Sequence, residues 1–460
     1  MTHRLAMLSD AVRSRLWPLP VLAIVLALVL GVVLPFVDTH LDSVVTGQPG
    51  AIQDVLFGGD ADAARTVLSA VASSLITVTS LTFSLTVVTL QLASSQFSPR
   101  LLRTFTGDLF VQGTLGVFLA TFTYSLVVLR RVRTANSAYA EFVPRLSVSF
   151  SFVLGVASVV MLVLFLAHLT GQIRPETMLR EVHSDAQSVM DGIRRRQGSD
   201  EAPRRVPVDQ LPAVPPGAHR LLAPQSGFIT SIDTRALLRR CTEVDLVCMV
   251  ERPIGRSVVE ATPIGWVWAS AAPAPSDLDE LAADLVSKSV QTGHERTAVD
   301  DLGYGLRQLT DVAAKALSPG INDPTTAVHT LGHISALLCD LSGLDLDPVV
   351  ASDDDGTLRV VLHQESFSRL VDGALTQLRR YGAGDPQVMS RLAQLLDELA
   401  YRCPSGRRDV VRGQVERLRA TVAAQDFDDT ELAQLERALA AADSTLGGRP
   451  VADRVEEQRR

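Results

Sequence analysis

The sequence predicts a membrane protein with four transmembrane helices and a cytoplasmic α+β region, in which a small β-barrel precedes a helical bundle. Two observations lead to this fold class. Of the 460 residues, 47% are hydrophobic and only 20% are charged, and the mean hydropathy is +0.20, which together are too apolar for an ordinary soluble enzyme. Four long apolar stretches fill the first third of the chain, and short β-rich runs and amphipathic patterns fill the rest.

The predicted transmembrane domain covers residues 1–173. About 20 apolar helical residues cross roughly 30 Å of hydrocarbon, and the stretches long enough to do so are residues 17–37, 67–92, 110–129 and 146–169. The first stretch is too long for a signal-peptide core and is interpreted as a permanent anchor. Arginine counts near the span ends favour placing both termini in the cytoplasm, although the cluster around Arg131 argues against this orientation.

The second span carries an unusual number of hydroxyl and amide side chains. At helical spacing they form one stripe of Ser73, Thr77, Ser80, Ser84 and Gln91 and another of Thr79, Thr82, Thr86 and Thr89. Such groups can replace part of the water around an ion or small solute, so the first stripe supplies the pore-lining candidates. One helix makes one wall, and a pore therefore requires a homo-oligomer. The alternative, which is favoured by the frequency of such patterns, is that these small residues only allow close helix packing.

No acidic residue or lysine lies within the four predicted spans, and Asp38 is placed in the loop after the first of them. Charged groups inside a membrane usually mark proton relays or coupled-ion sites. His168, near the end of the fourth span, is interpreted as an interfacial contact. These features favour a passive pathway over proton-coupled transport.

The remaining chain divides by composition. Residues 174–220 are charged and then proline-rich, which predicts a helix leaving the membrane and a linker. Short β-rich runs broken by Gly and Pro predict a small β-barrel at residues 221–270. Apolar residues recur at spacings of three and four in residues 277–446, as expected for a helical bundle, and residues 447–460 are predicted to be a disordered tail.

The first part of the predicted bundle contains a charged face and a helix boundary. Arg307, Asp311 and Lys315 follow at intervals of four residues, as on a solvated or interfacial helix face. Asp323 and Pro324 supply the N-cap and the first position of a new helix. Alternatively, Asn322, Asp323 and the free N–H groups at this helix start form an anion or ligand site, but the capping role is favoured.

The sequence contains none of the familiar catalytic or metal-binding signatures. It has no phosphate-binding loop, no G-x-S-x-G nucleophile and no H-E-x-x-H pair. The four cysteines form no C-x-x-C pair, and His329 and His333 lack a third ligand nearby in sequence. We therefore expect no catalytic residue, no metal and no cofactor, and we expect that the protein is not an enzyme. The net charge of −8 also predicts no nucleic-acid partner.

Two long segments carry a resemblance to a known family. They are SSLITVTSLTFSLTVVTLQLASSQFSPRLLR at residues 73–103 and RTAVDDLGYGLRQLTDVAAKALSPGINDPTTA at residues 296–327. Both are similar to a bacterial family of predicted inner-membrane proteins, the domain of unknown function 2254. This resemblance implies a multi-pass protein of the bacterial plasma (inner) membrane, but no activity. Because the resemblance assigns no functional residues, the candidates for a cytoplasmic motif are simply polar residues of the second segment. They are Arg296, Arg307, Asp311, Asn322 and Asp323.

The predicted function is a homo-oligomeric channel for an ion or small solute, lined by the second span and gated by the cytoplasmic domain. The alternative is a non-conducting scaffold or sensor whose cytoplasmic domain binds a partner or an unknown ligand, and a membrane-bound enzyme ranks third. The expected partners are the lipid bilayer and further copies of the chain. A channel predicts that the first stripe faces one aqueous axis, whereas a scaffold predicts that it is buried between helices.

Overall fold

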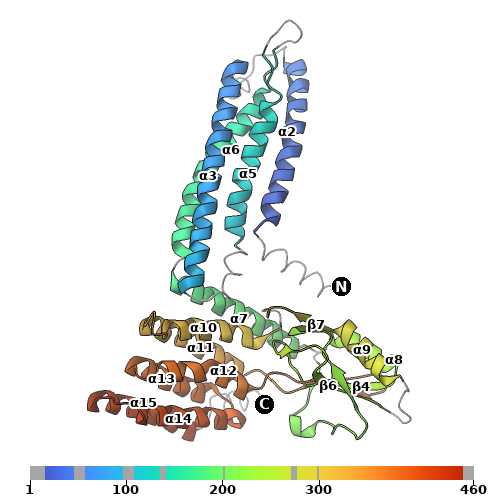
Figure 1. The fold of residues 1–460 in the computed structure, drawn as a ribbon, viewed down its shortest axis with the longest axis vertical. Helices are drawn as coiled ribbons and strands as arrows, with labels where there is room; N and C mark the ends of the chain where they lie inside the picture. Colours follow the sequence, from blue (N-terminus) through green and yellow to red (C-terminus); the bar gives the residue numbers. More distant parts are fainter. Residues whose placement is uncertain are drawn as a thin grey trace. The chain divides into compact units, whose positions relative to one another are not determined.

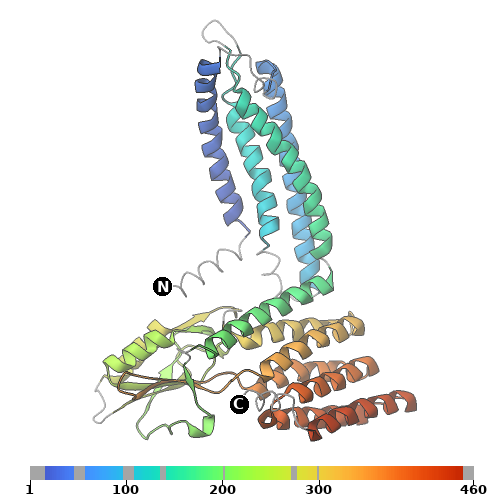
Figure 2. The same ribbon diagram turned by 180° about the vertical axis from the view of Figure 1, so that it is seen from behind.

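The structure is a computed structural model that describes residues 16–45, 57–96, 108–134, 141–172, 174–199, 203–270, 277–297 and 300–448. The chain divides into two compact units, Met1–Thr177 (unit 1) and Met178–Arg460 (unit 2). Among the described residues, the buried apolar clusters that include Leu68 and Val111 lie in unit 1, and those that include Leu221 and Met249 lie in unit 2. Figures 1 and 2 show the elements of both units from opposite sides.

Unit 1 is a bundle of long helices, and four of them are long and apolar enough to cross a membrane. This finding confirms the four predicted spans. The helix α5 packs against each of the other three, and Gly116 on α5 permits a close approach because a Cβ there would lie 3.3 Å from the Cβ of Ala23. The helices are α2 (Pro18–Val45), α3 (Ala61–Gln96), α5 (Leu109–Leu129) and α6 (Arg145–Gln172).

The helix that contains the first predicted span is longer than residues 17–37, because α2 continues through Asp38 to Val45. The carboxylate of Asp38 is buried and accepts hydrogen bonds from the N–H groups of Leu146 (2.8 Å) and Ser147 (3.1 Å). The Ser147 hydroxyl donates a third bond of 2.6 Å. Asp38 thus caps the N-terminus of α6, where a negative charge is stabilised by the free N–H groups and the helix dipole. A carboxylate therefore lies inside a candidate span, contrary to the expectation from sequence, and it has a structural role there.

Unit 2 begins with most of α7 (Pro175–Gln197) and contains two open sheets. In the six-stranded sheet the order is β1 (Arg204–Arg205), β8 (Val349–Ser352), β9 (Leu358–Leu362), β4 (Leu246–Val250), β6 (Pro263–Ala269) and β2 (His219–Leu222). In the three-stranded sheet the order is β5 (Ser257–Val258), β3 (Gly227–Ile232) and β7 (Val290–Gly293). The helices α8 (Thr234–Glu243) and α9 (Leu278–Ser289) pack against these strands.

The predicted β-barrel at residues 221–270 is wrong, because its strands form these open sheets with partners from elsewhere in the chain. The central strand β4 pairs in parallel with β9, with Cys248 opposite Val360. The strand β3 pairs with β7, with Ile232 opposite Val290. The partners β7, β8 and β9 come from the range that was predicted to be helical. Local patterns reveal strands but not the distant strands that complete a sheet.

The predicted helices of the C-terminal region are present as α10 (Leu302–Ala316), α11 (Pro324–Ser342), α12 (Phe367–Tyr381), α13 (Pro386–Arg402), α14 (Arg408–Ala423) and α15 (Asp429–Gly447). Figures 1 and 2 show them gathered on one side of unit 2, with the sheets on the other. Their apolar residues at spacings of three and four are buried, for example Leu392, Leu395 and Leu399. Of the predicted tail at 447–460, all but Gly447 and Gly448 lies outside the described residues, as does the stretch 97–103 of the first motif.

Candidate functional site

The polar stripe that was predicted to line a pore lies on the outer face of α3. All five members, Ser73, Thr77, Ser80, Ser84 and Gln91, are exposed in the single chain. At 3.6 residues per turn they fall within an arc of about 60°. Large apolar side chains flank this arc and are exposed as well, with Ile76 and Phe83 on one side and Leu81 and Val88 on the other. The stripe therefore lies at the centre of the α3 face that is turned away from its own bundle.

The second stripe of α3 faces the inside of the bundle. Thr82, Thr86 and Thr89 are buried and Thr79 is half-buried. Each hydroxyl donates to the carbonyl four residues earlier, at distances between 2.6 and 2.9 Å. Local bonds of this kind satisfy a hydroxyl without a partner on another helix. The two stripes thus have different environments, and only the second fits the interpretation of packing within one chain.

Polar side chains on the inner faces of α5 and α6 bond across the two helices. The hydroxyls of Ser125 and Ser151 lie 2.8 Å apart and are buried. The hydroxyls of Thr121 and Ser158 lie 3.4 Å apart. Tyr124 donates from its hydroxyl to the carbonyl of Ser147 at 3.1 Å. Such bonds between helices hold membrane bundles together.

Among the described residues, the outer stripe of α3 makes no interhelical bond of this kind. Ser73, Thr77 and Ser84 donate to carbonyls one turn back, at 2.6, 3.2 and 2.9 Å. Within the described residues, the side chains of Ser80 and Gln91 have no hydrogen-bonding partner. The stripe thus presents hydroxyl oxygens and an amide group to whatever surrounds the single chain.

His168 is more than the interfacial contact that the sequence suggested. Its Nε2 lies 2.5 Å from Oδ2 of Asp108. The other oxygen of Asp108 accepts a hydrogen bond of 2.8 Å from the N–H of Phe110 and caps α5. The pair therefore joins the last turns of α6 to the start of α5.

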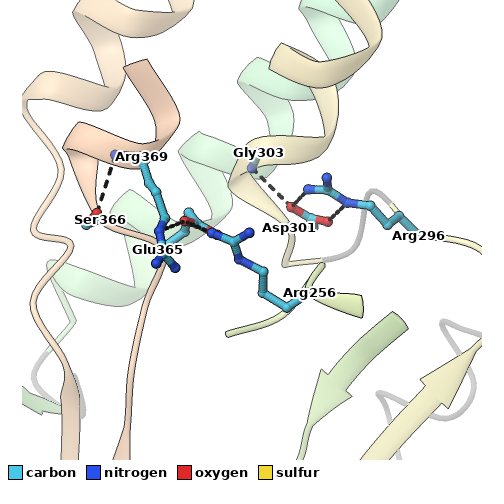
Figure 3. A network of polar contacts seen from close by, with 7 residues as sticks. All are labelled: Arg256, Arg296, Asp301, Gly303, Glu365, Ser366 and Arg369. Carbon is cyan, nitrogen blue, oxygen red and sulfur yellow. Dashed lines mark hydrogen bonds and ion pairs between the residues drawn. The ribbon is translucent and has the colours of Figure 1, made fainter. Parts of the chain in front are cut away.

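The second motif contributes a buried ion pair in unit 2 (Figure 3). Arg296 binds Asp301 in a bidentate geometry, with Nε 2.8 Å from Oδ2 and Nη2 2.7 Å from Oδ1. Asp301 is 3% exposed and also caps α10 by accepting a bond of 3.0 Å from the N–H of Gly303. Burial disfavours the charge on Arg296, but the bonds and charge of Asp301 outweigh it and raise the pKa of Arg296.

The turn between β4 and β5 packs directly against this pair. Gly255 has a φ of 85°, and a Cβ at this position would collide with the carboxylate of Asp301. Glycine therefore suits this position for both backbone and space. The next residue, Arg256, donates from Nη2 to Oε1 of Glu365 at 2.8 Å, and Arg369 lies 3.9 Å from the same oxygen. Figure 3 shows these residues where the turn and the starts of α10 and α12 meet.

The residues drawn in Figure 3 form a junction between the turn, α10 and α12. Sequence reasoning missed three of them, Arg256, Asp301 and Glu365. Asp301 had a usable signal, because an acidic residue directly before an amphipathic helix is a candidate N-cap. The sequence carries no local signal for the pair of Arg256 and Glu365, because these two residues are 109 positions apart.

The remaining motif candidates do not join this junction. Arg307 and Asp311 form an ion pair of 2.9 Å in the middle of α10. Asn322, with a φ of 51°, and Asp323 lie beyond the other end of that helix. Since the helix rises about 1.5 Å per residue, its 15 residues keep Arg296 and Asp323 far apart. The structure therefore does not gather the five candidates into one site.

Asp323 has the capping role that the sequence predicted. Its carboxylate accepts a bond of 3.0 Å from the N–H of Thr326 and one of 2.6 Å from the Thr326 hydroxyl. These hydrogen bonds lower the pKa of Asp323 below its ordinary value. Pro324 occupies the first turn of α11.

Histidines from α7 and α11 meet in unit 2. The rings of His183 and His333 lie 5.0 Å apart between centroids. Burial, together with the nearby His183, Arg180 and His329, lowers the pKa of His333. No group of three or more His, Cys, Asp or Glu side chains suited to a metal ion occurs among the described residues.

Four membrane-crossing helices and an α+β unit define this chain as a multi-pass membrane protein. The family model described as "Predicted membrane protein (DUF2254)" matches residues 13–398, so the chain belongs to that family. This match confirms the resemblance that the two motifs carry. Proteins named only as uncharacterized, from Mycobacterium tuberculosis and Mycobacterium bovis, are 34% identical over 421 residues, which covers 90% of this chain and 77% of each relative. No solved structure matches the chain.

Proposed function

We propose that the protein is a homo-oligomeric channel of the bacterial plasma membrane, with both termini in the cytoplasm and no enzymatic step. Several copies place their α3 helices around one axis, and an ion or small solute passes along the outer polar stripe. Unit 2 gates this pathway from the cytoplasm. The observation that carries the proposal is that Ser73, Thr77, Ser80, Ser84 and Gln91 are exposed on the face of α3 opposite its own bundle.

The energetics of polar groups in hydrocarbon support this arrangement. A polar group without a partner costs several kcal/mol in the apolar core of a bilayer. Local bonds relieve this cost for the protons of Ser73, Thr77 and Ser84, but not for the side chains of Ser80 and Gln91 within the described residues. Water along an axis between several copies satisfies all of them. A lone chain in lipid does not.

The chemistry of the stripe suits passive movement. The sequence between Arg65 and Arg100 contains no charged residue. Hydroxyl and amide groups replace part of a hydration shell without holding the solute through a fixed charge, so the solute can enter and leave.

A route for gating runs through α7, which begins three residues after α6 ends. Gly305 on α10 lies so close to α7 that a Cβ there would be 2.5 Å from the Cβ of Ala186. Arg196, at the end of α7, forms an ion pair of 2.5 Å with Asp300 at the start of α10. In this proposal a shift of α10 is passed to α7, which follows the membrane helix α6 in the sequence.

Flux through purified full-length protein in liposomes tests the proposal, with a panel of cations, anions and small neutral solutes. We expect Ser80→Leu and Ser84→Leu to abolish flux, because leucine replaces a hydroxyl on the axis by a larger apolar group. Thr86→Val is the matched control, since it removes a hydroxyl from the buried stripe, and we expect its flux to equal that of the wild type. An intact oligomer that passes nothing in the panel would overturn the channel and favour the non-conducting scaffold or sensor.

A further inference from the structure

A groove of about 300 Å³ runs between α3 and α6 on the surface of unit 1. Ala70, Ser74 and Val78 form its α3 wall, and Gly155 and Val159 form its α6 wall. The lining is almost entirely apolar, and small residues make the groove possible. At Gly155 a Cβ would lie only 3.4 Å from a methyl carbon of Val71, so larger side chains at this position fill the groove.

The groove borders the polar stripe on one side only. Ala70 and Ser74 each come one residue after a position that faces the stripe. Because a helix turns about 100° per residue, both lie about 100° from those positions around α3. On the opposite flank of the stripe, Ile76 and Phe83 protrude and are 48% and 58% exposed. At the depth of residues 70–78 the exposed face of α3 therefore has the groove on one flank, polar groups in the centre and Ile76 on the other flank, while Leu81 and Val88 continue the groove flank beyond Val78.

We propose that this groove receives Ile76 of a second copy of the chain, so that the α3 helices close into a ring around their polar stripes. The proposal deepens the channel proposal and rests on it for the position of the axis. Contact between two different flanks is heterologous, which is the type of interface that builds closed rings. Copies related by an axis along the membrane normal share the same depth, and Ile76 has the same depth as groove residues 70–78. Phe83, two turns further along α3, covers the end of the groove beyond Val78.

A second copy explains the surface better than a lipid chain does. A lipid chain in the groove leaves the neighbouring stripe in hydrocarbon, whereas a neighbouring α3 covers the groove and shields the stripe together. Ala70 and Ser74 also form a small-xxx-small pattern, which lets two helices approach closely. Within the described part of the chain, the Ser74 hydroxyl makes no hydrogen bond, so it is free for a neighbouring helix.

Disulfide crosslinking in native membranes tests this interface. The double variant Ser74→Cys/Ile76→Cys is oxidised with copper phenanthroline, and we expect a ladder of dimers and larger species on non-reducing gels. Neither single variant should crosslink, because position 74 of one copy meets position 76 of the next. Wild-type chain gives the background from the four native cysteines, all of which lie in unit 2. Ile76→Cys/Val160→Cys is the matched control, since Val160 is 55% exposed and lies outside the groove lining.

Three results would overturn the interface. A dimer from either single variant indicates a two-fold contact instead of a ring. Absence of a ladder from the double variant, when amine-reactive crosslinkers still trap oligomers, indicates that the copies meet at another surface. Retention of full oligomer size by Gly155→Leu, measured by light scattering in detergent, contradicts docking in the groove, because we expect this variant to lose the oligomer while Val160→Leu keeps it.

These readouts are independent of flux. Crosslinked rings that pass no solute would remove the channel and leave the interface. Flux without crosslinking would remove the interface and leave the channel.

Discussion

The Arg296–Asp301 pair shows how much can depend on one carboxylate in unit 2. Asp301 accepts both bonds from Arg296 and one from the N–H of Gly303, while Gly255 lies against it. Replacement of this residue by the isosteric asparagine removes the charge and keeps the shape. Arg296, which is 25% exposed, then loses the carboxylate that binds two of its nitrogens, and the charge of Glu365 acts on it more weakly.

We therefore expect Asp301→Asn to destabilise unit 2 by about 3 kcal/mol, the lower range for breaking a buried ion pair. Denaturant unfolding of the full-length protein, followed by fluorescence of Trp266 and Trp268 in β6, measures this loss. Asp409→Asn is the control, because Asp409 pairs with Arg412 on the surface at 89% exposure and such pairs contribute little. Equal stabilities of the two variants would contradict the importance of the buried pair.

His333 makes the stability of unit 2 depend on pH. Burial and the neighbouring His183, Arg180 and His329 lower the pKa of His333 in the folded protein, so the unfolded chain, with a pKa near 6.5, binds the proton more readily. The contribution of neutral His333 to the free energy of unfolding is therefore complete above about pH 6.5. It declines as the pH falls below that value. Half-buried His363, whose pKa is lowered by burial, adds in the same direction.

We expect the unfolding midpoint of unit 2 to drop between pH 7.5 and pH 5.5, and His333→Gln to show a smaller drop than the wild type. An unchanged pH dependence in His333→Gln would show that other groups produce it.

At the scale of elements, the contact of α7 with α10 depends on a missing side chain. A Cβ at Gly305 would lie 2.5 Å from the Cβ of Ala186, well inside van der Waals contact. Overpacking costs about 1–3 kcal/mol, and the better helix propensity of alanine returns about 1 kcal/mol. We expect Gly305→Ala to destabilise unit 2 by roughly 1 kcal/mol after this compensation.

The double variant Gly305→Ala/Ala186→Gly should recover much of this loss, and a double-mutant cycle from unfolding curves measures the coupling. Gly192→Ala on α7 is the control, because nothing lies near its added Cβ, and it should stabilise by about 0.5–1 kcal/mol. Additive effects of the two substitutions would mean that the helices separate to accept the methyl group.

The start of α11 depends on its cap. Loss of a side-chain cap costs about 0.5–2 kcal/mol, whereas asparagine caps nearly as well as aspartate. We therefore expect Asp323→Ala to lower the free energy of unfolding by about 1 kcal/mol and Asp323→Asn to lower it much less. Both variants should retain flux in liposomes. A loss of flux in Asp323→Asn without a loss of stability would instead assign the Asn322–Asp323 turn a role in ligand binding.

Elements whose signal is local were predictable from the sequence. The apolar length of α2, α3, α5 and α6 and the spacing of apolar residues in α10 to α15 arise from neighbouring residues, so the pattern predicts the helix. The sheets differ, because β4 pairs with β9 more than 100 residues later. The sequence placed Asp38 in a loop for the same reason. The N–H groups that bind its carboxylate in the structure belong to Leu146 and Ser147, more than 100 residues later.

At the scale of the whole molecule, periodicity showed that α3 has two polar stripes but not which way they face. That direction depends on α5 and α6, which cover Thr82, Thr86 and Thr89 and leave Ser73, Thr77 and Ser80 exposed. Sequence thus predicted the residues of the candidate pathway, and the packing of the other helices shows that these residues lie on the side that a second copy covers in our proposal. Subunit contacts consequently belong to unit 1 in our proposal.

The chain divides into two compact units, and each contains a buried apolar cluster of its own, so we expect two unfolding transitions rather than one. Asp301→Asn should shift only the transition of unit 2. Ser125→Ala, which removes a hydroxyl that bonds Ser151 across α5 and α6, should shift only that of unit 1, by about 1 kcal/mol or less. Hydrogen exchange of peptides from α5 and from β9 along a denaturant series reports the two units separately.

Because oligomer contacts stabilise the folded state by mass action, the unfolding midpoint of unit 1 should rise with protein concentration in detergent while that of unit 2 stays constant. A rise in both midpoints would mean that unit 2 also contributes to the subunit interface, and a constant midpoint for unit 1 would contradict a ring built through α3.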